Sequence, residues 1–173
     1  MKKTLTAMVM FAALASLTAG AGQYAMVSAV SPAQIPMAQE HLDGVRFNIF
    51  YGECMSVNGL DVGFMGRTRE SFNGLQIAAC SLVGTEAAGC QLGVVNFVNA
   101  GFDGFQCGLV NLVDADCAGF QLGVWNAGQD VAGFQLGVVN RAGRLSGLQV
   151  GLLNFIDEPQ QTVRCLPILN FGW

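Results

Sequence analysis

The residues of this chain that could do chemistry are few. His41 is the only histidine, and it lies beside Glu40 and Asp43. A cysteine or serine nucleophile would need this histidine as its base, but the local sequence is typical of a solvated loop. Asp114 and Asp116 are one residue apart, whereas a calcium site needs about six or more oxygens. We therefore predict no catalytic residue, no metal site and no cofactor, and interpret the protein as a non-enzyme.

The six cysteines allow two interpretations. They stand at positions 54, 80, 90, 107, 117 and 165, and no pair has the CxxC spacing of a zinc or redox site. Buried cysteine is a small hydrophobic residue, so these residues could simply fill a core. An exported chain could also form disulfides, and Cys107 and Cys117 are then the best candidate pair. Cys54 and Cys165 lie near opposite ends of the chain, and we expect both outside the core and too far apart to pair.

Glycine recurs at nearly constant spacing and defines a tandem repeat. Copies begin at Gly44, then every 15 residues to Gly119, and then at Gly133 and Gly147. The later copies read GCQLGVVN, GFQCGLVN, GFQLGVWN, GFQLGVVN and GLQVGLLN, so the pattern is G-Φ-Q-Φ-G-Φ-Φ-N, where Φ is apolar. We number these eight positions as slots 1 to 8. About eight copies in phase indicate a repeat architecture.

Alternation within each copy predicts a β-strand. Slots 2, 4 and 6 are apolar, and slots 3 and 5 hold Gln and Gly, so we expect the apolar slots to face inward. The Asn of slot 8 is typical of a turn. A further apolar slot recurs two residues before the next copy and predicts a second inward segment. We call it the late slot; its residues are Val57, Phe72, Ala87, Phe102, Cys117, Val131 and Leu145.

These features predict an all-β fold, a narrow parallel β-solenoid of about eight coils with 14–15 residues each. Stacked coils at about 4.8 Å would give a rod of roughly 38 Å. Residues of the same slot in successive coils would then lie directly over one another. We therefore expect their side-chain amides to form hydrogen-bonded ladders. The glutamine ladder would contain Gln76, Gln91, Gln106, Gln121, Gln135 and Gln149. The asparagine ladder would contain Asn96, Asn111, Asn126, Asn140 and Asn154.

A small antiparallel outer-membrane β-barrel is the alternative fold and the alternative function. The end of the chain favours it, because apolar residues stand at the alternate positions Leu169, Phe171 and Trp173, and the last of them is aromatic. Two observations oppose it. The clean alternation lasts about seven residues, whereas a spanning strand needs about 9–11. A meander should also repeat every two strands, but here each copy has the same turn.

The beginning of the chain predicts export. Lys2 and Lys3 precede an apolar run and the small residues Ala19 to Ala21, so residues 1–21 are interpreted as a signal peptide. Residues 22–43 would form a linker or cap, 44–160 the tandem repeats, and 161–173 a C-terminal cap built on a partial ninth copy. We expect the protein in the outer membrane, at the cell surface or in the periplasm.

Charge limits the partners. After the leader, six arginines remain against twelve acidic residues, a formal charge of −6, and no basic stripe exists. Such a surface repels phosphate backbones, so we expect no nucleic acid partner. The slot-7 residues would form an outward apolar row that contacts an unknown protein, glycan, membrane or envelope partner, or a second copy. This interaction row is Val95, Val110, Trp125, Val139 and Leu153.

The order of the motifs carries a resemblance to a known family. The run GVRFNIFYG from Gly44, the NGLDVG run from Asn58, the iterated GFQLGVVN units and the close LPILNFGW from Leu166 are similar to bacterial surface-repeat proteins of the leptospiral type. The similarity covers about residues 40–173. It implies an exported or surface protein built from tandem repeats, in a family of unknown function, and supplies no active site. We predict a non-enzymatic structural or adhesive role in the bacterial envelope. The several cysteines and the weak third copy depart from the usual pattern.

Overall fold

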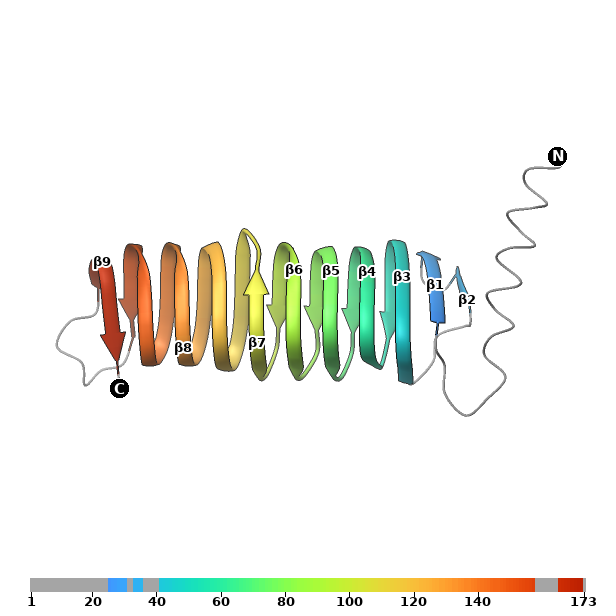
Figure 1. Cartoon of the computed structure of the whole chain (residues 1–173), viewed down its shortest axis with the longest axis horizontal. Coiled ribbons are helices and arrows are strands. Elements are labelled where there is room, and N and C mark those ends of the chain that lie inside the picture. Colours follow the sequence, from blue (N-terminus) through green and yellow to red (C-terminus); the bar gives the residue numbers. More distant parts are fainter. Residues whose placement is uncertain (1–24, 31–32, 36–40, 158–164, 173) are drawn as a thin grey trace.

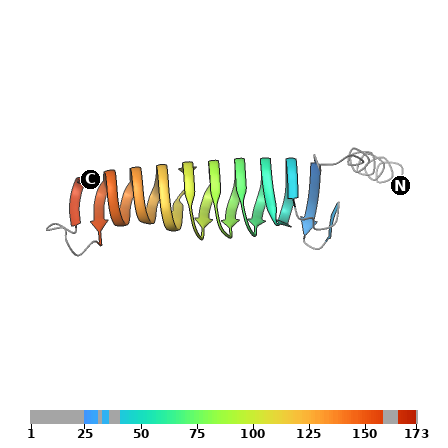
Figure 2. The same cartoon turned by 90° about the horizontal axis from the view of Figure 1, so that it is seen from below.

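The structure, a computed structural model, describes residues 25–30, 33–35, 41–157 and 165–172. The predicted signal peptide at 1–21 lies outside the described residues. The described chain forms strands without helices and winds into a rod whose coils stack along the long axis (Figures 1 and 2). The strands are β1 Ala25–Val30, β2 Ala33–Ile35, β3 His41–Cys54, β4 Ser56–Thr68, β5 Phe72–Val83, β6 Ala87–Val98, β7 Phe102–Cys107, β8 Val110–Ile156 and β9 Cys165–Gly172.

Pairing between successive strands from β3 to β8 is parallel and follows the repeat. Gly44 pairs with Gly59, Gly59 with Gly74, and the same register continues to Gly119. The predicted parallel β-solenoid is confirmed, and the alternative of an antiparallel barrel is wrong. The pairings between separate strands amount to about five turns rather than the eight coils expected. The chain continues to wind within β8, where side chains 14 residues apart bond to one another.

Antiparallel strands occupy both ends of the parallel stack. At the N-terminal end β1 pairs in parallel with β3 and forms an antiparallel pair with β2. At the C-terminal end β9 runs antiparallel to β8, with Leu148 opposite Phe171. The expectation of a partial ninth copy is therefore wrong in direction, although the segment does lie on the last coil. Sequence similarity to a copy does not fix strand direction, because alternating side chains suit either pairing.

The predicted inside and outside of the main strand are reversed. The Gln of slot 3 and the Asn of slot 8 are fully buried in the ladders, whereas slots 2, 4 and 6 point outward. In the seventh copy, for example, Gln135 and Asn140 are 0% exposed, while Leu136 and Val138 are 37% and 42% exposed. Alternation gives the period of a strand but not which face is buried. Stacked amides satisfy one another, which removes the usual cost of burying them.

The apolar part of the core comes from the late slot and, in five of the eight copies, from the tenth position counted from the repeat glycine, which we call slot 10. The late-slot residues are buried as predicted, from Val57 and Phe72 to Leu145. Slot 10 adds Val83, Val98, Val113, Ala142 and Ile156. Cys54, which we expected outside the core, is 2% exposed and packs in this cluster. A bulge between Asn48 and Tyr51 shifts the register of β3 and turns Cys54 inward.

The glycine of slot 1 forms a corner that no other residue could form. All eight of these glycines have φ between 112° and 149°, a backbone conformation closed to residues with a Cβ. They also stack closely, and a Cβ on Gly119 would lie 2.1 Å from the carbonyl oxygen of Gly104. The presence of glycine at slot 1 of every copy therefore follows from the corner and from the tight contact between coils.

Candidate interaction surface

The glutamine ladder forms a continuous buried line of hydrogen bonds. Each Nε2 donates to Oε1 of the preceding glutamine at 2.7–2.9 Å, from Gln149 back to Gln76. Gln76 then donates to Oδ2 of Asp61 at 2.7 Å. At the other end Asn170 Nδ2 of β9 donates to Gln149 Oε1 at 3.4 Å. All amide dipoles of this ladder therefore point in one direction along the rod.

The asparagine ladder has the opposite direction. Each Nδ2 donates at 2.8 Å to Oδ1 of the following asparagine, from Asn96 to Asn154. The same Nδ2 also donates at 2.9–3.2 Å to a backbone carbonyl of the next copy, as Asn111 does to Leu122. These asparagines are buried within the coil, so the prediction of a turn at slot 8 is wrong. The two antiparallel dipole rows offset one another and hold the coils in register.

A buried ion pair ends the glutamine ladder. Arg46 and Asp61 occupy slot 3 in the first two copies, and both side chains are 0% exposed. Arg46 donates to both oxygens of Asp61, at 2.9 and 2.6 Å, and also to Arg67 O and Thr68 Oγ1. Asn48 Nδ2 donates to the same carboxylate at 2.7 Å. Sequence reasoning missed this pair, although both residues stand in the slot that later copies give to glutamine.

Slots 2, 4 and 6 form what we call the apolar wall, and every one of its 24 positions is apolar. Its side chains point outward, and Phe64 and Leu152 are 60% and 67% exposed. The wall comprises Val45, Phe47, Ile49, Leu60, Val62, Phe64, Leu75, Ile77, Ala79, Cys90, Leu92, Val94, Phe105, Cys107, Leu109, Phe120, Leu122, Val124, Phe134, Leu136, Val138, Leu148, Val150 and Leu152. Monomeric soluble proteins rarely expose an apolar surface of this extent.

The wall carries local relief. The slot-2 rings of Phe105, Phe120 and Phe134 stack with centroid separations of 5.4 and 5.0 Å and form a ridge. Over the first four copies, an open groove of about 710 Å³ runs between the slot-4 and slot-6 rows. Its floor is slot 5, where Gly63 and Gly93 leave only backbone. The backbone there pairs with adjacent coils, so the groove offers apolar side chains to a partner and few free hydrogen-bonding groups.

The predicted interaction row of slot 7 lies at the edge of the wall. Slots 6 and 7 both face outward, so the chain turns a corner there. Trp125 and Leu153 are each 45% exposed, while Val95, Val110 and Val139 are half-buried. The row is thus outward and apolar, but it is the narrow margin of a much broader surface. That surface was missed because slots 2, 4 and 6 had been predicted to lie inside.

All six cysteines lie in the described part of the chain, and none of them forms a disulfide there. Cys107 points outward from the apolar wall, and Cys117 is buried in the late slot, so the predicted disulfide between them does not form. Cys90 also lies on the wall rather than inside. Burial raises the pKa of the Cys117 thiol to about 12 and raises the pKa of Cys54 as well. Neither thiol is therefore an activated nucleophile in the folded protein.

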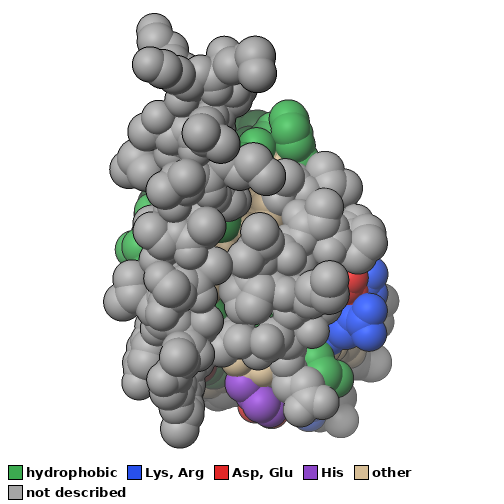
Figure 3. All heavy atoms as spheres, turned by 90° about the vertical axis from the view of Figure 1, so that its right-hand side faces the viewer, with side chains coloured by type: hydrophobic (Ala, Val, Ile, Leu, Met, Phe, Trp, Pro, Cys, Tyr) green, Lys and Arg blue, Asp and Glu red, His purple; other side chains and the backbone are tan. Residues whose placement is uncertain are grey.

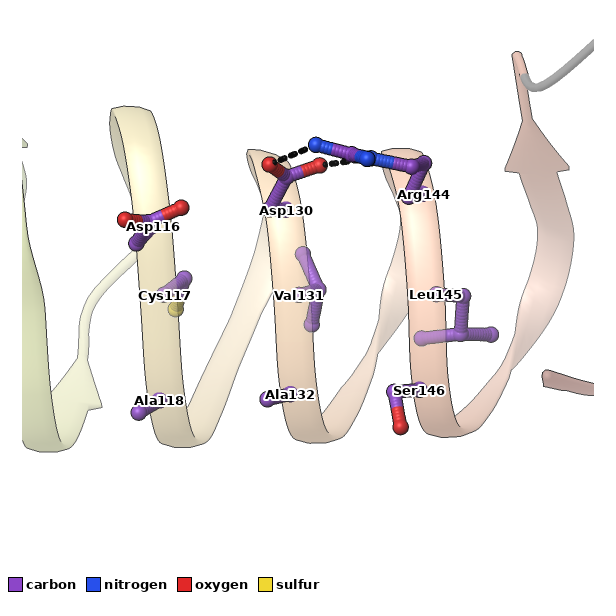
Figure 4. A pocket seen from close by; sticks show the side chains of 9 residues that line it. All are labelled: Asp116, Cys117, Ala118, Asp130, Val131, Ala132, Arg144, Leu145 and Ser146. Atoms are coloured by element: carbon purple, nitrogen blue, oxygen red, sulfur yellow. Dashed lines mark hydrogen bonds and ion pairs between the residues drawn. The ribbon is translucent and has the colours of Figure 1, made fainter. Parts of the chain in front are cut away.

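Charged residues occupy other sides of the coil. The late-slot residues Cys117, Val131 and Leu145 line a pocket of about 420 Å³. Figure 4 shows Asp116, Asp130 and Arg144 on one side of this row and Ala118, Ala132 and Ser146 on the other. Arg144 donates to both carboxylate oxygens of Asp130 and lowers the pKa of that carboxyl. At the N-terminal end, Arg69 pairs with Glu53 at 2.6 Å, and charged side chains gather on one side of the end view (Figure 3).

These charged groups do not assemble a reactive centre. His41 is exposed at the start of β3, and Asp114 and Asp116 are exposed on β8. Over the described ranges, no three His, Cys, Asp or Glu side chains lie close enough together to hold a metal ion. The same part of the chain contains no helix that is long and apolar enough to cross a membrane.

Comparisons with known proteins give no relative. No family model, no curated protein and no solved structure matches this chain.

Proposed function

We propose that this chain is an exported, non-enzymatic surface-repeat protein with a structural or adhesive role in the bacterial envelope, and that the apolar wall is its contact surface. The observation that carries the proposal is the wall itself. Twenty-four outward positions without one polar side chain stand on strands whose inward slots 3 and 8 hold buried polar side chains, mostly amides. Water disfavours such a surface, so we expect it to be covered in the working protein.

The rigidity of the scaffold supports a binding role. Parallel pairing fixes the coils to their neighbours, and from the fourth copy onward both ladders add to it, so the wall residues keep a constant spacing along the rod. A preorganised surface loses little conformational entropy when it binds. The basic start of the chain, its apolar run and the order of its motifs support export and an envelope location.

Cell fractionation tests the location. The full chain, expressed in a Gram-negative host, should lose its leader after residue 21 and be recovered with the envelope. Mass spectrometry of the recovered chain identifies the cleavage. An uncleaved chain that stays in the cytoplasm would contradict the proposed export.

Envelope retention tests the wall. The double variant L136D/V138D places two charges on exposed wall positions and should be released from washed envelopes. Ser146→Asp is the matched control, because Ser146 is exposed beside Arg144 and away from the wall. Equal retention of the wild type and the double variant would show that the wall is not the contact surface.

A further inference from the structure

We infer that the partner which covers the apolar wall is a second copy of this chain, packed wall against wall. The inference rests on the wall being a contact surface, as proposed above, and it names the occupant. It does not depend on export.

The first argument is periodicity. Coils repeat at about 4.8 Å, so successive side chains within each row of the wall lie about that far apart along the rod. A second chain has the same spacing, and its side chains can therefore fit between those of the first chain over the whole length of the rod. Face-to-face packing of two sheets in this way is a standard arrangement, with the sheets about 10 Å apart. The stacked rings of Phe105, Phe120 and Phe134 give each copy a preformed ridge for such packing.

The second argument is area. Slots 2 to 6 span about 17 Å along a strand, and the eight repeats of one chain span roughly 38 Å along the rod. The wall of one chain therefore offers about 650 Å², before the slot-7 margin and β9 are added. Stable protein interfaces bury about 800 Å² per partner. Slot 7 adds about 130 Å² and β9 adds about 80 Å². Leu169 and Phe171 of β9 are about half exposed, so the whole surface reaches about that size.

The third argument is charge. The wall has no charged residue, so two walls meet without repulsion and without burying an unpaired charge. The Asp130–Arg144 and Glu53–Arg69 pairs lie elsewhere on the coil. A lipid surface is the other apolar partner to consider. Proteins that lie on membranes usually carry many lysines and arginines on the polar side, but here no lysine follows Lys3 and acids outnumber arginines.

The oligomeric state in detergent-free buffer is the primary test. Sedimentation equilibrium of the purified protein, as the host processes it, should give twice the chain mass. The variant L136D/V138D should be a monomer with an unchanged circular dichroism spectrum, while Ser146→Asp should remain a dimer. A monomeric wild type, or an open series of larger species, would overturn the inference of a closed pair.

Native cysteines identify the face that is buried. Cys90 and Cys107 lie on the wall, whereas Cys165 is exposed on β9 opposite Phe155, away from the wall. In the dimer, Cys90 and Cys107 should react with a maleimide at least tenfold more slowly than in the L136D/V138D monomer, and Cys165 should react equally in both. Equal reactivity of Cys90 and Cys107 in dimer and monomer would place the interface elsewhere and overturn the inference.

Vesicles separate this inference from the proposed function. If the wild type is monomeric and co-floats with phosphatidylcholine vesicles, which it binds through the apolar wall, the inference that a second chain covers the wall is overturned. The wall would still be a contact surface. A wall variant that keeps both its association and its envelope retention would instead contradict the proposed function.

Discussion

At the scale of single residues, the unusual feature is a full ion pair inside a narrow rod. Arg46 and Asp61 are both 0% exposed, and the carboxylate accepts from Arg46, Asn48 and Gln76. Buried pairs are costly to desolvate and are stable only when nearly every donor and acceptor is satisfied. Here the pair supplies a charged acceptor for the positive end of the glutamine dipoles. We interpret it as the element that sets the direction of the glutamine ladder.

Breaking this ion pair should strongly lower the free energy of unfolding. Replacing both of its residues with glutamine, which extends the ladder, should lower the free energy of unfolding less. Arg46→Gln leaves the Asp61 carboxylate buried without its cation and should lower the free energy of unfolding by about 3–5 kcal/mol. The double variant R46Q/D61Q continues the glutamine column and should lose less than the sum of the two single variants. Urea denaturation measures all three. Strict additivity would show that the two residues act independently.

The buried thiol of Cys117 predicts a stability loss in alkali. Its pKa is raised to about 12 in the folded protein from an ordinary value of 9.0. Between these values the folded thiol keeps its proton and the unfolded thiol does not, so the stabilisation is complete below pH 9 and is lost as the pH rises. The difference amounts to about 4 kcal/mol by pH 12.

The control for this effect is Cys117→Ala under reducing conditions. The variant is less stable throughout because it leaves a cavity, but its free energy of unfolding should fall less steeply above pH 9. Parallel stability curves for the two proteins between pH 9 and pH 11 would contradict the role of Cys117.

At the scale of elements, the coils from the fourth copy onward are held by two amide ladders of opposite direction rather than by a fully apolar core. Gln106 illustrates the dependence of neighbouring copies on one another. It donates to Gln91 and accepts from Gln121, both at 2.8 Å. A ladder hydrogen bond contributes only about 1 kcal/mol, but an unpaired buried amide group costs about 1–3 kcal/mol. The ladders therefore contribute specificity of register more than stability.

Interrupting the glutamine ladder should show that dependence. Gln106→Leu leaves Oε1 of Gln91 and Nε2 of Gln121 unpaired and should lower the free energy of unfolding by about 3 kcal/mol. Gln129→Leu is the matched control, because Gln129 is exposed and lies outside the ladder; it should change stability by less than about 0.5 kcal/mol. Thermal unfolding of both variants provides the comparison, and equal losses would contradict the ladder's role.

At the scale of the whole molecule, the chain is a one-dimensional stack in which each copy contacts mainly its neighbours. Parallel register extends from β3 to β8, and antiparallel strands occupy both ends. Sheet edges invite further pairing, and a change of strand direction at the ends is one way to limit it. The length of the rod, and with it the area of the apolar wall, is therefore set by the number of copies.

Removing one whole copy should shorten the rod without changing its fold. Deletion of residues 119–132 joins Ala118 to Gly133 and keeps every slot in phase. The variant should keep its β circular dichroism signal and melt at a somewhat lower temperature. Deletion of residues 119–125 removes half a copy and places apolar slots over the amide columns. That variant should not fold. A cooperative unfolding transition in it would contradict the conclusion that equivalent slots of successive copies must stack on one another.

The repeat by itself determined much of this protein. Glycine at intervals of 14–15 residues and strict alternation predicted a parallel solenoid, stacked side chains at slots 3 and 8, and a buried late slot. Single departures from the pattern carried less information. Arg46 and Asp61 stand in the glutamine slot, but nothing in the sequence says that this slot is buried and that the two charges therefore pair.

Only the tertiary structure decided which face of the strand lies inside. Alternation is symmetric between the two faces of a strand, and the burial of an amide is favourable only if a second amide lies directly above it. In this rod the stacking supplies that second amide, so Gln135 and Asn140 are buried and Leu136 and Val138 are exposed. The same reversal creates the apolar wall, which is why the contact surface could not be predicted from the sequence.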